Sequence, residues 1–121
     1  KGENYGWKIL GWGGTNYSGS KIGPKWKPGF TKAIKYWVPS IATSAITIYK
    51  GSEFKEWNGL ALVTSLKDKS LRAIDFSDLS NVKENLVFKD KIGRLRDIQV
   101  HPKNGKIYFL AGNSLWLMEK N

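Results

Sequence analysis

From residue 44 onwards, apolar and polar positions alternate in short runs that are separated by turn-forming residues. Runs of this kind, rich in β-branched and aromatic side chains and bounded by Gly, Pro, Asn, Asp and Ser, are typical of strands. No segment carries an apolar stripe at helical spacing over three turns. The sequence therefore predicts an all-β protein. The expected strands are residues 45–49, 60–66, 71–76, 85–88, 95–100, 106–111 and 115–118.

The strand pattern repeats within the chain. Residues 59–64 and 70–74 can be aligned with residues 105–110 and 114–118, so that Gly59 matches Gly105 and Ser70 matches Ser114. A period of roughly 40 to 50 residues with about four strands per unit is typical of a β-propeller blade. Closed propellers have about four to eight blades. We therefore expect about two blades at the end of a larger propeller.

The domain boundaries follow from the repeat. We interpret residues 1–121 as the C-terminal part of a single propeller domain. Its divisions would be a loop-rich leading segment (1–43), one four-stranded blade (44–90) and three strands of the next blade (93–121).

Composition excludes several classes of chemistry. The chain has no Cys, which excludes disulfides, thiolate catalysis and zinc held by Cys. No apolar run approaches the roughly 18 residues of a membrane span. The single histidine, His101, precedes an Asn-Gly turn between two predicted strands, and the chain has no other histidine that could form a Ser-His-Asp arrangement elsewhere or a metal site built from histidines. We therefore expect no metal site in this chain and no catalytic role for His101.

The net charge of +10 comes from dispersed lysines. Seventeen of the 20 basic residues are Lys, spread along the whole chain, and only three are Arg. A nucleic-acid binder would need a contiguous basic patch, so we expect no nucleic-acid partner. Arg suits geometric recognition of carboxylates better than Lys because its planar fork binds them bidentately. Two of the three, Arg94 and Arg96, lie close together.

Strand order predicts where the candidate binding residues meet. In a four-stranded antiparallel meander, the turn between the second and third strands lies at the same end as the connection to the next blade. This rule places Lys67 at the same end as Arg94 and Arg96, with Tyr36 and Trp37 just before the first strand. In this arrangement the three cations could converge on one anionic ligand with several carboxylates, with Trp37 or Tyr36 as a flat apolar wall.

A structural alternative remains open for the same residues. Arg94 and Arg96 could instead pair with Asp90 or Asp97, and Trp37 could pack between blades.

Four motifs carry a resemblance to a known family. They are GENYGW at 2–7, YWVPSIATS at 36–44, SLK at 65–67 and GRLRD at 93–97. In this order they resemble the C-terminal portion of the soluble glucose/sorbosone dehydrogenases, also called aldose sugar dehydrogenases dependent on pyrroloquinoline quinone (PQQ). The resemblance implies a six-bladed propeller that oxidises the C1 hydroxyl of aldoses with PQQ, usually with calcium. It also implies a periplasmic or secreted protein, an external electron acceptor and the rest of the propeller as a partner.

The resemblance also implies roles for individual residues. PQQ is a flat ortho-quinone with three carboxylates, so it needs cations at its edge. Trp37 and Tyr36 would wall the sugar subsite. In this family the catalytic His and the calcium ligands lie upstream, so we expect no catalytic residue here and no turnover by the chain alone. The cofactor would contact Ser40, Lys67, Arg94 and Arg96.

A second function stays open from the sequence. A propeller of the same lineage that has lost the cofactor could bind a glycan or a protein partner. Retention of Lys67, Arg94 and Arg96 together favours the enzyme, because a descendant that only binds has no need for three cations at one end.

Overall fold

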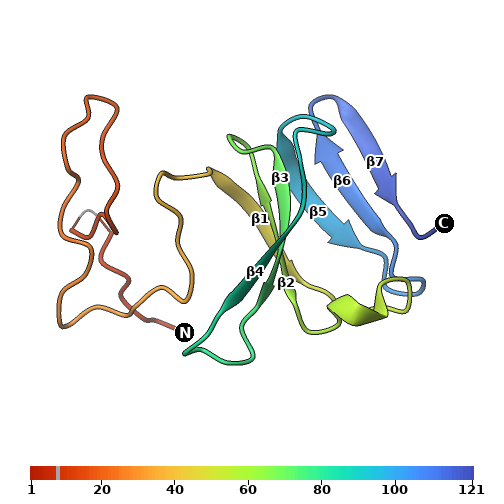
Figure 1. Ribbon diagram of the computed structural model, residues 1–121, viewed down its shortest axis with the longest axis horizontal. Coiled ribbons are helices and arrows are strands. Elements are labelled where there is room, and N and C mark those ends of the chain that lie inside the picture. Colours follow the sequence, from red (N-terminus) through yellow and green to blue (C-terminus); the bar gives the residue numbers. More distant parts are fainter. Residues whose placement is uncertain (8) are drawn as a thin grey trace. The chain divides into compact units, whose positions relative to one another are not determined.

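The computed structural model describes residues 1–7 and 9–121. The described residues are all-β, as the sequence predicts, and each predicted run overlaps one strand (Figure 1). A short 3₁₀ helix, η1 (Lys55–Trp57), follows the first strand. The strands are β1 (Thr43–Ile48), β2 (Ala61–Ser65), β3 (Ser70–Asp75), β4 (Lys83–Lys89), β5 (Leu95–Val100), β6 (Ile107–Ala111) and β7 (Ser114–Met118).

The strands form two antiparallel meanders. One sheet has the order β1-β2-β3-β4, and the other has the order β5-β6-β7. The predicted repeat is confirmed, because Gly59 and Gly105 each lie two residues before the second strand of their sheet and both have positive φ. Ser70 and Ser114 each open the third strand.

The chain divides into two compact units, residues 1–40 and 41–121. The first unit is mostly irregular, with one isolated bridge between Thr15 and Lys21. It buries Leu10, and Trp26 donates its indole N–H to the carbonyl oxygen of Phe30. Among the described residues, no helix is long and apolar enough to cross a membrane.

The core of the second unit lies between the two sheets. β5 packs against β1 and β2, and the apolar side chains of facing strands meet there. Burying these side chains is the main favourable contribution to folding of the unit. The fully buried members include Leu62, Leu71, Leu95, Ile107 and Phe109.

Aromatic side chains of the same core join the sheets at the end where β1 finishes. Tyr49 is fully buried and donates its hydroxyl to the carbonyl oxygen of Gly105 at 2.8 Å. The same hydroxyl accepts the N–H of Phe54 at 3.0 Å. Trp57 of η1 stacks on Phe54 with ring centroids 4.7 Å apart. These contacts fix the turn between β5 and β6 against the segment that follows β1.

Candidate functional site

Three cations lie at one end of the two sheets, the end at which β1 and β5 begin and β2 turns into β3 (Figure 1). Lys67 lies in the β2–β3 turn, Arg94 directly precedes β5, and Arg96 is its second residue. Ser44 joins the sheets at this end, with its Oγ 2.7 Å from the carbonyl oxygen of Leu95. We call Lys67, Arg94 and Arg96 the cationic end.

The turn that carries Lys67 is held by its backbone. The N–H groups of Leu66 and Lys67 donate to the carbonyl oxygens of Ala42 (2.8 Å) and Ile41 (3.2 Å). Under the turn, the hydroxyls of Ser65 and Ser70 lie 2.8 Å apart and are buried. The Lys67 side chain itself is exposed, so the turn is fixed without using the ammonium group.

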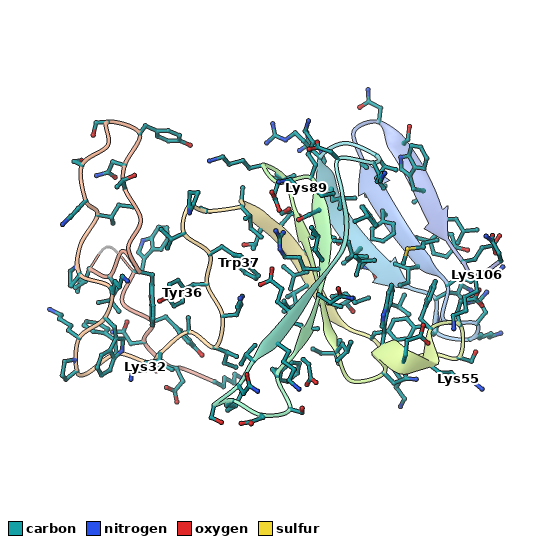
Figure 2. All side chains as sticks on the ribbon, viewed as in Figure 1. Lys32, Tyr36, Trp37, Lys55, Lys89 and Lys106 are labelled. Carbon is teal, nitrogen blue, oxygen red and sulfur yellow. The ribbon has the colours of Figure 1, made fainter. Side chains whose placement is uncertain are left out.

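An ion-pair cluster supports the same turn. Arg72 forms ion pairs with Asp68 and Glu84. Lys89, at the end of β4 (Figure 2), forms an ion pair with Asp68 at 2.9 Å. The bonds from Lys89, Arg72 and Ser70 lower the pKa of Asp68 to about 2, against the opposing effect of burial. The carboxylate beside Lys67 is therefore already neutralised by other cations.

Sequence reasoning missed this cluster. The available signal was Arg72 inside a strand between apolar neighbours, with Asp68 four residues earlier in the preceding turn. A charged side chain in such a position needs a partner when it is partly buried.

A β-bulge holds Arg96. The register passes from Leu95 opposite Ala111 to Asp97 opposite Leu110, so Arg96 is an extra residue in β5. β1 has a bulge at the equivalent second position, where Ser44 is the extra residue. A bulge re-aims a side chain and is common beside functional sites.

The structural alternative for Arg94 and Arg96 is wrong within the described part of the chain. Asp90 pairs with Lys69 at 3.4 Å, and Asp97 accepts the N–H of Ile98 at 2.8 Å. Both arginines are exposed and form no ion pair with residues 1–7 or 9–121. Their charges are available to a ligand.

The aromatic candidates belong to the first unit (Figure 2). The ring of Tyr36 lies 4.8 Å from that of Trp12, and Nζ of Lys35 lies 5.6 Å from the centroid of a Trp37 ring. Ser40 is exposed at the end of this unit. The expectation that these residues share one site with the cationic end stays a prediction, as does the alternative for Trp37.

His101 lies at the opposite end, in the β5–β6 turn, as the strand order predicts. Its Nδ1 accepts the N–H groups of Lys103 (3.3 Å) and Asn104 (3.4 Å). The imidazole therefore stabilises its own turn. An open hollow of about 650 Å³ also lies at this end, lined by Lys50, Asn58, Gln99 and five other residues.

The described part of the chain holds no group of three or more His, Asp or Glu side chains that could bind a metal ion. The expected position of the calcium ligands, upstream of this chain, stays a prediction.

Fold and site together define an all-β protein of repeated antiparallel sheets that presents exposed cations at one end. Residues 1–115 match the sequence profile of the family described as Glucose / Sorbosone dehydrogenase. The chain belongs to this family, which confirms the resemblance carried by its motifs.

Individual relatives agree with this assignment. The chain is 32% identical over 118 residues to aldose sugar dehydrogenase YliI of Escherichia coli (strain K12), covering 94% of this chain and 31% of the relative. It is 29% identical over 113 residues to an uncharacterized protein of Synechocystis sp., covering 92% and 27%.

Two crystal structures resemble nearly the whole chain. The soluble aldose sugar dehydrogenase from Escherichia coli in its apo-form superposes with a TM-score of 0.82 and 31% identity, covering 99% of this chain and 36% of that protein. A glucose dehydrogenase gives a TM-score of 0.83 and 28% identity, covering 99% and 35%. The chain thus spans about a third of the length of the relatives it matches.

Proposed function

We propose that this chain forms the cofactor-edge part of a quinoprotein that oxidises the C1 hydroxyl of aldose sugars with PQQ. The observation that carries the proposal is the cationic end, where three exposed cations are held by backbone contacts in a member of this family. The 32% identity to an aldose sugar dehydrogenase supports the substrate class.

The donor set of this end fits the cofactor. PQQ carries three carboxylates, and charge-assisted bonds from Lys and Arg to carboxylates are among the stronger hydrogen bonds in proteins. Lys67, Arg94 and Arg96 supply the matching number of cations, and their side chains form no ion pair within residues 1–7 and 9–121. No carboxylate of the described chain would have to be displaced.

The candidate residues then have three kinds of role. When bound, PQQ accepts the two electrons removed from the sugar. Lys67, Arg94 and Arg96 hold its carboxylate edge, and a cation near the quinone oxygens stabilises the negative charge that develops on reduction. Ser40 contributes a polar contact. Tyr36 and Trp37 present flat apolar faces to the C–H face of a pyranose.

The proposal includes the architecture and the cellular setting. The sheet β1-β2-β3-β4 and the sheet β5-β6-β7 would be two blades of a six-bladed propeller, preceded by a loop-rich segment at 1–43. Calcium ligands and the catalytic base would come from the remaining two thirds of the enzyme. Electrons would pass to an external acceptor in the periplasm or outside the cell.

The alternative of a cofactor-less binding propeller predicts a different cationic end. A protein that only binds a glycan or a partner has no reason to keep three cations free of carboxylates at one end of its sheets. Arg94 and Arg96 do not pair with the nearby Asp90 and Asp97, which favours the quinoprotein.

Substitutions at the cationic end test the proposal. The experiment uses the complete enzyme, meaning a polypeptide that carries this chain together with the remaining length that its relatives have. Lys67→Ala or Arg96→Ala removes one charge-assisted contact, worth about 1.5 to 3 kcal/mol. The dissociation constant for PQQ, measured by fluorescence titration, should therefore rise roughly 10- to 150-fold.

The matched control is Lys103→Ala. Lys103 is an exposed lysine in the β5–β6 turn, at the other end of the sheets, and its loss changes the net charge equally. Its variant should bind PQQ as tightly as the parent. Equal weakening by all three substitutions, or by none, would show that this end does not hold the cofactor.

A further inference from the structure

The start of β1 connects the backbones of two of the three cations. Ahead of the strand, the carbonyl oxygen of Ile41 accepts the N–H of Lys67 at 3.2 Å. Within the strand, the hydroxyl of Ser44 bonds the carbonyl oxygen of Leu95, the residue directly before Arg96. One short segment of the chain therefore contacts both the β2–β3 turn and the first residues of β5.

The hydroxyl of Ser44 has a defined direction. It donates to Leu95 at 2.7 Å, because a carbonyl oxygen can only accept. Ser44 Oγ also lies 2.9 Å from Oγ1 of Thr64. A serine has one proton to donate, so the hydroxyl of Thr64, which is fully buried in β2, donates to Ser44. The result is a chain of two hydroxyls that runs from β2 through β1 to β5 and joins the two sheets.

The acceptor at the end of this chain belongs to the peptide group that leads into Arg96. The C=O of Leu95 and the N–H of Arg96 lie in one planar unit, so a bond to that oxygen fixes the orientation of the plane. Arg96 is the extra residue of a β-bulge, where the regular pairing with the neighbouring strand is interrupted. Ser44 therefore supplies a bond from the other sheet at the point where the ladder of β5 is weakest.

Backbone strain lies in the same segment. Ala42 has a φ of +53°, a left-handed conformation that is unfavourable for a residue with a Cβ. Its carbonyl oxygen accepts the N–H of Leu66 at 2.8 Å, one residue before Lys67. Strain of this kind persists only where the surrounding contacts impose it, and it is common beside functional sites. The contacts of the segment thus outweigh its own conformational preference.

We propose that Ser44 is a positioning residue, which sets the orientation of Arg96 through the carbonyl of Leu95. Cations on two different sheets can hold the carboxylates of one rigid ligand only when their spacing is fixed before the ligand binds. Ser44 provides this fixation for Arg96 relative to Lys67. The inference rests on the proposed function for the identity of the ligand, but not for the effect of Ser44 on Arg96.

Crystal structures of the complete enzyme without PQQ test the positioning directly. Ser44→Val and Ser44→Thr introduce side chains of the same shape that differ in the hydroxyl. Ser44→Val should rotate the Leu95–Arg96 peptide and move the Cα of Arg96 by on the order of 1 Å, whereas Ser44→Thr should keep the parent geometry. An unchanged peptide in Ser44→Val would overturn the proposal. If this variant does not fold, Ser44→Ala removes the same hydroxyl without adding a methyl group.

Fluorescence titration with PQQ measures the consequence for binding. Ser44→Val should raise the dissociation constant roughly tenfold, the lower end of the range for Arg96→Ala, because the charge is kept but misplaced. Ser44→Thr should bind within about twofold of the parent. The double variant Ser44→Val/Arg96→Ala should bind no more than about twofold more weakly than Arg96→Ala alone. Losses that multiply in the double variant would show that Ser44 does not act through Arg96.

Tyr49→Phe is the control for a merely structural role. The Tyr49 hydroxyl also donates to a carbonyl oxygen across the two sheets, that of Gly105 at 2.8 Å, but at the opposite end. Its loss should lower the free energy of unfolding and leave the dissociation constant for PQQ within about twofold of the parent. Equal weakening of PQQ binding by Tyr49→Phe and Ser44→Val would mean that Ser44 only stabilises the fold, and the proposal would be wrong.

Failure of the proposed function has a different signature. If Arg96→Ala leaves the dissociation constant for PQQ unchanged, Arg96 does not hold the cofactor. The crystal structures without PQQ still decide whether Ser44 sets the orientation of Arg96.

Discussion

The charged residues at and near the β2–β3 turn fall into two groups: those that hold the turn through ion pairs, and Lys67, whose ammonium group takes no part in holding it. Asp68 pairs with both Arg72 and Lys89 and so holds the turn, while Lys67 is fixed through its backbone N–H. A partly buried ion pair stabilises the fold only when its geometry is good and its remaining bonding groups are satisfied. Arg72 meets this condition because it also bonds Glu84 at 2.6 Å and the hydroxyl of Ser70 at 2.6 Å.

The lowered pKa of Asp68 gives a pH-dependent prediction. Its pKa of about 2 in the folded protein lies below the ordinary value of 3.8, so the unfolded chain takes up a proton first as the pH falls. The stabilisation is full above about pH 4 and is lost as the pH falls toward 2. Asp68→Asn should therefore destabilise the complete enzyme at pH 5 and much less at pH 2, measured by denaturant unfolding.

The control for this prediction is Asp90→Asn, which removes the carboxylate of the Lys69–Asp90 pair. Both side chains of this pair are more exposed than Asp68. The substitution should change the free energy of unfolding little at any pH. A destabilisation by Asp68→Asn that stays constant from pH 5 to pH 2 would contradict the role given to its carboxylate.

At the residue scale, the sequence predicted where the cations of the candidate site lie but not which ion pairs form beside them. Lys67, Arg94 and Arg96 were found because motifs and strand order place them near one end. The ion pairs of Arg72 were not found, because Glu84 meets it only through the register of β3 and β4, and register depends on tertiary packing. The exposure of Arg94 and Arg96 could not be decided either, since acidic residues lie close in sequence to both.

At the scale of elements, a glycine two residues before the second strand of each sheet sets the turn. Gly59 and Gly105 have φ of +87° and +72°, a region that other residues enter only with strain. The surroundings differ, however. A Cβ on Gly59 would meet no atom within 4 Å, whereas a Cβ on Gly105 would lie 2.8 Å from the Tyr49 hydroxyl and 2.9 Å from the backbone N of Ser52.

This difference gives a matched pair of substitutions. Gly59→Ala should cost about 1–2 kcal/mol of unfolding free energy from backbone strain alone. Gly105→Ala should cost about 1–3 kcal/mol more, because Tyr49 and the neighbouring backbone must move. Urea unfolding of the two variants of the complete enzyme measures the difference. Equal losses would mean that the Tyr49 contact does not fix the β5–β6 turn.

The elements themselves were largely predictable. Alternating apolar positions and turn residues located the seven strands seen in residues 1–7 and 9–121, because both signals are local. Boundaries moved by one or two residues, and β4 begins two residues earlier than expected, at Lys83, since charged residues on an exposed edge strand weaken the apolar pattern. The bulges at Ser44 and Arg96 were not predicted, because they are defined by a partner strand.

At the scale of the whole molecule, the second unit consists of two sheets with a hydrophobic core between them. The cationic end lies where β1 and β5 begin. Its repeat was visible in the sequence because Gly and Ser recur at equivalent turn and strand positions. The position of Tyr36 and Trp37 relative to the cationic end is not a local property, and the sequence pattern of residues 1–40 contains no regular period that would fix it. The relatives that the chain matches are about three times its length.

The most direct test of the account is a titration of the complete enzyme with PQQ in the presence of calcium, followed by addition of an aldose while the cofactor absorbance is recorded. We predict stoichiometric binding, reduction of the cofactor by the sugar, and weakened binding in Lys67→Ala. A folded complete enzyme that does not bind PQQ would contradict the account. It would favour the alternative of a cofactor-less propeller that binds a glycan or a protein partner.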